Sequence, residues 1–481
     1  MSFRQKVIGG VRWTGFSSLG ATVIKLIQLA VLAHFLSPTD FGLMAIVSVI
    51  IGWSALFLDF GISAAIIYKQ NITNTQLSSL YWLNVLVSVI LFFFVFSIAP
   101  YLAFFYNNTT LLPLIRILAI TFIFSGLGNQ FAILLQKNLK FKLLAIHNLV
   151  SVLVGFIVAV VLAVNNFGVY AIVFSTIATA VVNALLNILW GIGIYRPKFV
   201  FSWGELDGII SFGLFQMGER SINYLTSQFD VLLIGKLLGP EILGIYSIAK
   251  NISMKPFQII NPIVNKVTFP IMSMLQDDEH RLRKIFLSTI NYLCSVNFPI
   301  YILVILLADG IILTFFGEKW VDAIVILQIL STYRMFPSFG NPIGTLQLAK
   351  GRADLGFYWN LALFAFVPLA IYAGSQWGII GVASSLLILQ VLLFYPAWAF
   401  LVGPLAKTSF KSYWKTVFKP FIIAFLGGFI GYLVGFVVGL DEFIVKAMLY
   451  GAVMVMTGYY LNHKYNRDFI DVMFDFVSRR K

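Results

Sequence analysis

Charged residues and cysteines are scarce in this chain. Only 11% of its 481 residues are Asp, Glu, Lys or Arg, whereas a soluble domain carries about 25%. The single cysteine, Cys294, excludes an intrachain disulfide and a site built from several thiolates. The four histidines, His34, His147, His280 and His463, lie far apart in the sequence and show no ligand spacing. No metal site is therefore expected.

Long apolar runs take the place of charge, and 60% of the residues are hydrophobic. A helix needs about 20 apolar residues to cross the hydrocarbon core of a bilayer. Fourteen segments meet this length, so the sequence predicts an all-α integral membrane protein. The predicted spans are 13–36, 42–67, 79–105, 111–135, 144–164, 167–193, 207–235, 241–270, 284–308, 320–347, 355–374, 377–402, 418–439 and 443–461.

Basic residues are distributed unevenly between the two ends of these spans. With the N-terminus inside, 23 of the 33 Lys and Arg residues fall on the cytoplasmic side, against Lys236, Lys319 and Lys446 on the other. Short loops rich in Lys and Arg stay in the cytoplasm. We therefore expect a multi-pass protein of the bacterial inner membrane with both termini cytoplasmic. Because the basic residues are scattered among the spans, no nucleic-acid partner is expected.

The two halves of the chain repeat a motif. Residues 36–42 read LSPTDFG and residues 238–244 read LGPEILG, a shift of 202 residues, and similar shifts persist over six segments. This favours duplication of a six-helix unit, with the copies related by a pseudo-two-fold axis along the membrane normal. Chance matches in a biased alphabet are the alternative. We expect an N-terminal lobe over 1–200, a C-terminal lobe over 201–403, and two appended helices with a cytoplasmic tail over 404–481.

Ionisable residues inside the predicted spans are mostly basic. An ionisable side chain at bilayer depth costs about 2.5 to 3.5 kcal/mol on insertion scales, so it normally faces a bundle interior or a water-filled cavity. The excess of positive charge favours an anionic ligand such as a diphosphate or an acidic sugar. Seven basic residues, Lys25, Arg116, Arg220, Lys250, Lys255, Lys266 and Arg334, stand against three acidic ones, Asp59, Glu219 and Asp230.

Polar residues recur at helical spacing in three of the same spans. The stripes are Gln216, Glu219, Asn223, Ser227 and Asp230 in 207–235; Ser247, Asn251, Gln258, Asn261 and Asn265 in 241–270; and Ser331, Arg334, Ser338, Asn341 and Thr345 in 320–347. Pro256 and Pro262 predict a bend in the second of these spans.

The charges and stripes together predict a substrate cavity. We expect it to be lined by Lys25, Arg220, Lys250, Lys255, Arg334, Asn223, Asn251 and Gln258, with Asp59, Glu219 and Asp230 as candidates for binding a coupling proton or sodium ion. Three alternatives remain open. Lys25, Arg116 and Lys266 could extend to the membrane interface, the other basic residues could form neutralised pairs, and the stripes could be interhelical hydrogen bonds.

Several motifs resemble those of a known transporter family. They are LSPTDFGLMA at 36–45, LDFGIS at 58–63, LLQKNLKFK at 134–142 and the Gly-Pro-Glu turn at Gly239. On these residues the whole chain resembles the polysaccharide transporter family, the Wzx-type flippases of the multidrug/oligosaccharidyl-lipid/polysaccharide exporter superfamily. Only Asp59 is carried over by motif. The motifs do not specify the sugar.

The resemblance implies two six-helix lobes with a cationic cleft, alternating access, and an undecaprenyl diphosphate-linked oligosaccharide as cargo. Its implied partners are this lipid-linked oligosaccharide and membrane lipids, with a polysaccharide polymerase and co-polymerase as further candidates. The chain is expected to act as a monomer. No cofactor is expected beyond a coupling H+ or Na+, since no P-loop pattern occurs.

Two other functions are compatible with a polytopic membrane protein. A drug or organic-cation antiporter of the same superfamily would favour a cavity dominated by acidic and aromatic residues, which the charge balance opposes. A membrane-embedded polymerase or glycosyltransferase would need a long external loop for its catalytic residues, and the predicted external loops are short. The chain is therefore expected not to be an enzyme.

Overall fold

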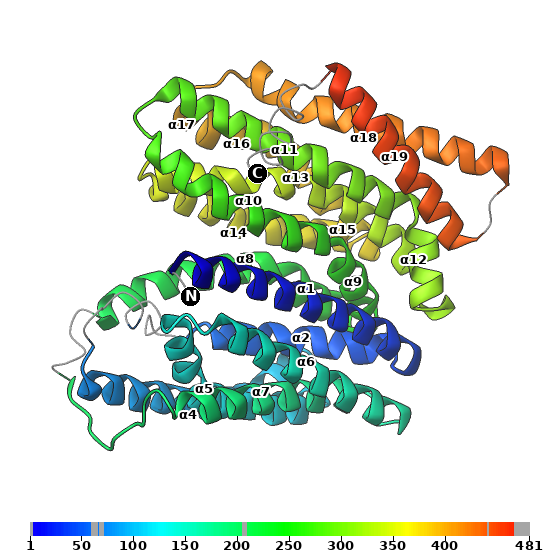
Figure 1. Cartoon of the computed structure of the whole chain (residues 1–481). Helices are drawn as coiled ribbons and strands as arrows, with labels where there is room; N and C mark the ends of the chain where they lie inside the picture. The colour runs from blue at the N-terminus through cyan, green and yellow to red at the C-terminus, as the bar shows by residue number, and fades with distance from the viewer. Residues whose placement is uncertain (1–2, 59–65, 67–71, 204–208, 440–441, 466–481) are drawn as a thin grey trace. The chain divides into compact units, whose positions relative to one another are not determined.

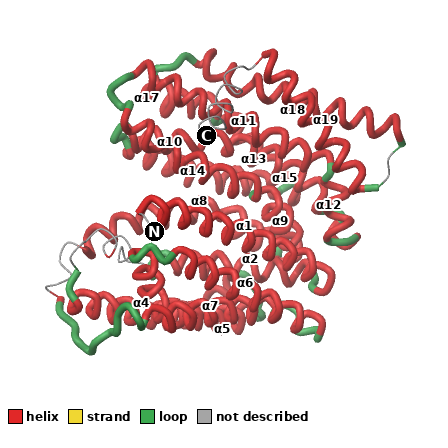
Figure 2. Tube along the Cα trace, viewed as in Figure 1, coloured by secondary structure: helices red, strands yellow, loops and turns green. Residues whose placement is uncertain are grey.

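The computed structural model describes residues 3–58, 66, 72–203, 209–439 and 442–465. These residues form helices joined by short loops, and Figure 2 shows no strand among them. The predicted all-α class is thus confirmed. The chain divides into two compact units, residues 1–244 and 245–481.

The first unit is a bundle of long helices (Figure 1). In it α6 packs against α1 and α7, α5 packs against α4 and α7, and α2 packs against α8. The helices are α1 (Phe3–Phe35), α2 (Pro38–Ala55), α4 (Asn74–Phe105), α5 (Leu111–Lys137), α6 (Phe141–Val164), α7 (Tyr170–Gly191) and α8 (Ile209–Leu237).

The second unit is built around α11 (Glu279–Leu306), which packs against α10 (Lys255–Met274), α13 (Ala323–Ala349) and α18 (Phe410–Val438). Phe286, Cys294 and Tyr301 of α11 lie in its apolar core. The other helices are α9 (Pro240–Ser253), which begins in the first unit, α12 (Ala308–Phe315), α14 (Ala353–Ser375), α15 (Gly378–Leu392), α16 (Phe394–Ala397), α17 (Gly403–Ala406) and α19 (Phe443–Tyr465), with short segments η2 (Glu318–Trp320) and η3 (Trp398–Val402).

The described residues of each predicted span lie mainly in helices, while residues 59–65 and 67 of the span 42–67 and residues 207–208 of the span 207–235 lie outside the described residues. Apolarity does not confirm the count of fourteen. Among the described residues, ten helices are long and apolar enough to cross a membrane, and eleven if the pair 378–392 and 394–406, bent by 42°, forms one span. The short helix α12 falls outside this set, and so do α8, α9, α10 and α13. The last four are the helices that carry the three polar stripes. The lobe boundaries at residues 200 and 403 stay a prediction.

The span predicted over 241–270 consists of two helices. Helix α9 ends at Ser253 and α10 begins at Lys255, with Pro256 in its first turn. Proline disfavours the helical conformation in the residue before it, and its missing N–H is tolerated in a first turn. The chain therefore breaks where the prolines predicted a bend.

The repeated motif has the same role at both of its positions. Pro38 and Pro240 each open a helix, α2 and α9, and Ser37 caps α2 through a capping box with Asp40. The two turns also meet reciprocally. A Cβ added to Gly42 would overlap the carbonyl of Pro240, and one added to Gly244 would overlap the carbonyl of Pro38. Glycine is required at both positions because backbone packs directly against backbone.

Replacing Gly42 by Ala should destabilise the protein, because backbone atoms at Pro240 cannot rotate away from the new methyl group as a side chain can. Overpacking of this kind costs about 1 to 3 kcal/mol. We expect the apparent Tm in detergent to fall by several degrees. Gly15→Ala is the control, since a Cβ there meets nothing within 4 Å. Equal melting of the two variants would contradict this contact.

Candidate functional site

Helix α8 presents a polar face in the first unit. Arg220, Asn223 and Ser227 follow one another at helical spacing, and all three are exposed. A guanidinium and an amide along a membrane helix cannot face lipid without a cost of several kcal/mol. Their exposure therefore marks a face of α8 that borders water.

The acidic candidates differ in what can be described. Asp230 is buried, and its Oδ1 accepts a hydrogen bond from the Val231 N–H at 2.8 Å. It lies ten residues after Arg220, or about 15 Å along a helix, so the two do not form a pair. Asp59 and the side chain of Glu219 lie outside the described residues. A coupling role for these three carboxylates stays a prediction.

A second polar face runs from α9 into α10. Asn251 and Gln258 are exposed and Lys255 is half-buried, at intervals of four and three residues. The Asn251 side chain also donates to the Ser247 carbonyl at 2.8 Å. Lys250 is buried, with 6% of its surface exposed. Of the predicted stripe, Asn251 and Gln258 are exposed, whereas Ser247 and Asn261 are buried, so only part of it is accessible.

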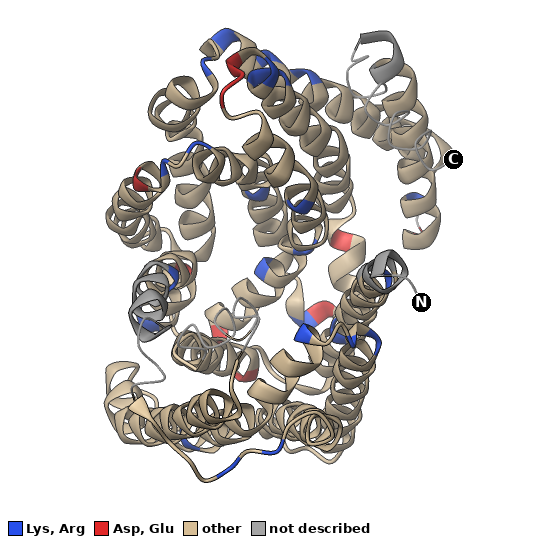
Figure 3. Ribbon diagram, turned by 60° about the vertical axis from the view of Figure 1, so that its left-hand side comes forward, with Lys and Arg blue, Asp and Glu red and all other residues tan. Residues whose placement is uncertain are grey.

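Arg334 lies half-buried in the middle of α13. Its Cζ is 5.1 Å from the ring centroid of Tyr333, and its Nε is buried without a hydrogen-bond acceptor. Arg334 forms no ion pair with any carboxylate among the described residues, whereas the pairs Arg281–Asp278, Arg352–Asp354 and Lys407–Glu279 lie at the surface. Basic positions thus occur along membrane helices as well as at their ends (Figure 3).

The basic residues expected near helix ends divide into two groups. Lys25 on α1 and Lys266 on α10 are exposed. Arg116 instead packs over Phe96, with its Cζ 4.4 Å from the ring centroid, a cation–π contact. Arg116 is therefore engaged with an aromatic side chain of α4.

Three helices of the second unit share a buried polar cluster that the predicted site did not include. Asn261 of α10, Asn297 of α11 and Ser338 of α13 are completely buried and linked by hydrogen bonds. Tyr301, one turn beyond Asn297, lies close to Arg334. In the sequence, only the four-residue spacing of Asn297 and Tyr301 around Pro299 could have indicated a polar contact on this helix. It lies in an otherwise apolar segment.

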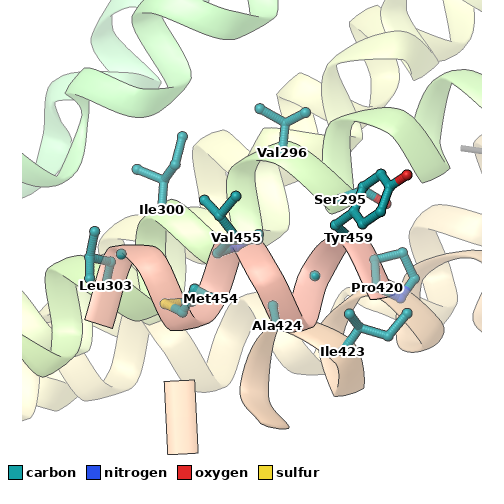
Figure 4. A pocket seen from close by; sticks show the side chains of 13 residues that line it. Ser295, Val296, Ile300, Leu303, Pro420, Ile423, Ala424, Met454, Val455 and Tyr459 are labelled. Carbon is teal, nitrogen blue, oxygen red and sulfur yellow. The ribbon is translucent and has the colours of Figure 1, made fainter. Parts of the chain in front are cut away.

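An apolar cavity of about 380 Å³ lies in the second unit between α11, α18 and α19 (Figure 4). Its wall includes Ile300, Leu303, Pro420, Met454 and Val455. Ser295 and Tyr459 are among the few polar side chains that line it. The cavity suits an apolar chain rather than a headgroup. Among the described residues, no group of three His, Cys, Asp or Glu could hold a metal ion.

Residues 31–325, more than half of the chain, match the model of a family described as polysaccharide biosynthesis protein. The chain belongs to this family. It is 32% identical over 416 residues to the lipopolysaccharide biosynthesis protein WzxC of Escherichia coli, covering 86% of this chain and 84% of WzxC. It is 35% identical over 381 residues to the teichuronic acid biosynthesis protein TuaB of Bacillus subtilis, covering 78% of each.

Solved structures of transporters share the fold of this polysaccharide biosynthesis family member. The lipid II flippase MurJ, in an inward closed conformation, aligns with a TM-score of 0.74 at 15% identity, covering 94% of this chain and 99% of MurJ. An inward-facing multidrug resistance transporter of the MATE family aligns with a TM-score of 0.63 at 16% identity, covering 81% of this chain and 96% of the transporter. The chain thus shares the fold of these two transporters.

Replacing Arg334 by Met should raise the stability of the protein. The guanidinium is half-buried with an unsatisfied Nε, and apolar replacement of buried charges is often neutral or stabilising by about 1 to 4 kcal/mol. We expect the apparent Tm in detergent to rise by a few degrees. Arg352→Met, which breaks an exposed pair with Asp354, should change it little. A clear fall for Arg334→Met would show that the guanidinium stabilises the fold.

Proposed function

We propose that this protein is a flippase that moves an undecaprenyl diphosphate-linked oligosaccharide from the cytoplasmic to the periplasmic leaflet by alternating access. The observation that carries this proposal is Arg334, a membrane-helix guanidinium that pairs with no carboxylate of the described residues. A protein keeps such a costly group where a ligand completes it. The names of the relatives, in lipopolysaccharide and teichuronic acid biosynthesis, agree with a polysaccharide precursor.

The polar faces of the helices suit the two ends of this cargo. In the second unit Arg334, Lys250 and Lys255 offer positive charge to a diphosphate, which forms strong charge-assisted hydrogen bonds with guanidinium and ammonium groups. In the first unit Arg220 and Lys25 offer the same chemistry. The amides of Asn223, Asn251 and Gln258 supply donors and acceptors for sugar hydroxyls. The polyprenyl tail stays in lipid or against apolar surfaces such as the cavity between α11, α18 and α19.

The proposal also covers ion coupling, the oligomeric state and the partners of the protein. A proton or sodium ion at Asp59, Glu219 or Asp230 couples it to an ion gradient. The protein acts as a monomer in the inner membrane with both termini cytoplasmic, and delivers its product to a polymerase and co-polymerase. This function is favoured over the antiporter and enzyme alternatives, because described acidic groups are sparse on the polar faces and the loops opposite the basic side are short.

Reconstitution in vesicles with a lipid-linked oligosaccharide tests the function. The wild-type protein should move the glycan across the bilayer, read out by its accessibility to an added glycosidase. Arg334→Gln, Arg220→Gln, Lys250→Gln and Lys255→Gln should each slow translocation at least tenfold, about 1.4 kcal/mol, without loss of insertion.

Lys411→Gln is the matched control, because it removes the same charge from an exposed position near the start of α18. It should translocate at the wild-type rate. Normal translocation by all four site variants would remove the site assignment. A wild-type protein that moves no lipid-linked glycan, with or without an ion gradient, would remove the proposed function.

A further inference from the structure

A buried hydrogen bond joins α10 to α13 one helical turn from Arg334. Asn261 of α10 is completely buried, and its Nδ2 donates a hydrogen bond to the backbone carbonyl oxygen of Ser338 at 2.6 Å. Ser338 follows Arg334 by four residues, so the two lie on the same face of α13. This hydrogen bond thus fixes the part of α13 that carries Arg334, whose guanidinium forms no ion pair among the described residues.

The carbonyl that Asn261 reaches is one that α13 cannot satisfy itself. In a regular helix the Ser338 carbonyl would accept the N–H of residue 342, but residue 342 is a buried proline without an N–H. Its ring also crowds the carbonyl four residues earlier. An unsatisfied carbonyl inside the membrane costs several kcal/mol. The neighbouring helix therefore supplies a donor where proline has removed one.

A third helix sets the orientation of that donor. Asn297 of α11, also completely buried, donates from Nδ2 to the Oδ1 of Asn261 at 3.4 Å. With its oxygen engaged by Asn297, the Asn261 amide directs Nδ2 toward Ser338. Tyr301, one turn further along α11, lies close to Arg334. Three helices are thus fixed relative to one another at the level of Arg334.

We infer that Asn261 and Pro342 form a positioning element for Arg334. Pro342 removes the regular helical partner of the Ser338 carbonyl, Asn261 holds that carbonyl, and this contact sets the position of Arg334 for the anionic headgroup. This inference rests on the proposed function. It assigns to Asn261 and Pro342 a role in binding the substrate, beyond their part in the fold.

A compensating pair of substitutions separates positioning from stability. Asn261→Leu leaves the Ser338 carbonyl without a partner, so it should lower both the apparent Tm and the rate of translocation. Adding Pro342→Ala restores a backbone N–H to that carbonyl. The double variant N261L/P342A should therefore melt at or above the wild-type temperature and still translocate at least tenfold more slowly. Pro368→Ala, which removes a proline inside α14, is the control and should translocate normally.

The defect should also depend on Arg334. Coupled residues show non-additive effects, so adding Arg334→Gln to N261L/P342A should slow translocation no further than Arg334→Gln alone. A double variant that recovers both melting temperature and translocation would overturn the positioning role. One that fails to recover stability would overturn the proposed hydrogen bond. If the double variant cannot be purified, the translocation rate of Pro342→Ala alone is measured. A wild-type rate for that variant contradicts the inference. If neither the wild-type protein nor Pro368→Ala translocates the glycan, the result would contradict the proposed function.

Discussion

The cost of placing a charged or hydrogen-bonding group in hydrocarbon organises this structure. Ten described helices are apolar enough to cross a membrane by composition alone. Helices α8, α9, α10 and α13 are not, and they hold Arg220, Lys250, Lys255 and Arg334. Such helices are stable in a bilayer only if their polar faces meet water or protein. The same constraint that makes these helices poor spans makes them the candidates for binding a headgroup.

The constraint applies to backbone groups as well as to charges. Prolines lie inside α10, α11 and α13 of the second unit, at Pro262, Pro299 and Pro337 among others. Each proline leaves a carbonyl without its helical donor, and the membrane offers no water to replace it. The Asn261 amide meets this need at Ser338. A side chain of α10 thus satisfies a carbonyl that proline has left free in α13, four residues from Arg334.

Local patterns in the sequence were enough to predict the helices, whereas the predicted polar stripes are exposed only in part. Hydrophobic run length located the spans, and Pro256 located the break between α9 and α10. Of the stripe predicted in 207–235, Asn223 and Ser227 are exposed, whereas Asp230 is buried. The class of fold and the family followed from the same patterns and motifs.

Features that depend on packing between helices could not be predicted. Lys250 is buried and Lys255 is half-buried, a difference set by the helices that pack around each of them. The structural role of Asn297 and Tyr301 follows from the packing of α11 against α10 and α13, which the sequence does not specify. Even the stripe through Asn261 combined two roles. Asn251 and Gln258 are accessible, whereas Asn261 is a buried interhelical donor.

Access of water to the polar faces is the central claim, and thiol labelling in membranes measures it most directly. Cys294, the single native cysteine, is completely buried, so single cysteines at Asn251 and Arg220 can be probed with a hydrophilic maleimide. Both should react, and a lipid-linked diphosphate should slow the reaction. A cysteine at Phe366, 50% exposed on the apolar helix α14, should stay unlabelled because it faces lipid. The absence of labelling at positions 251 and 220, or equal labelling at position 366, would contradict the account.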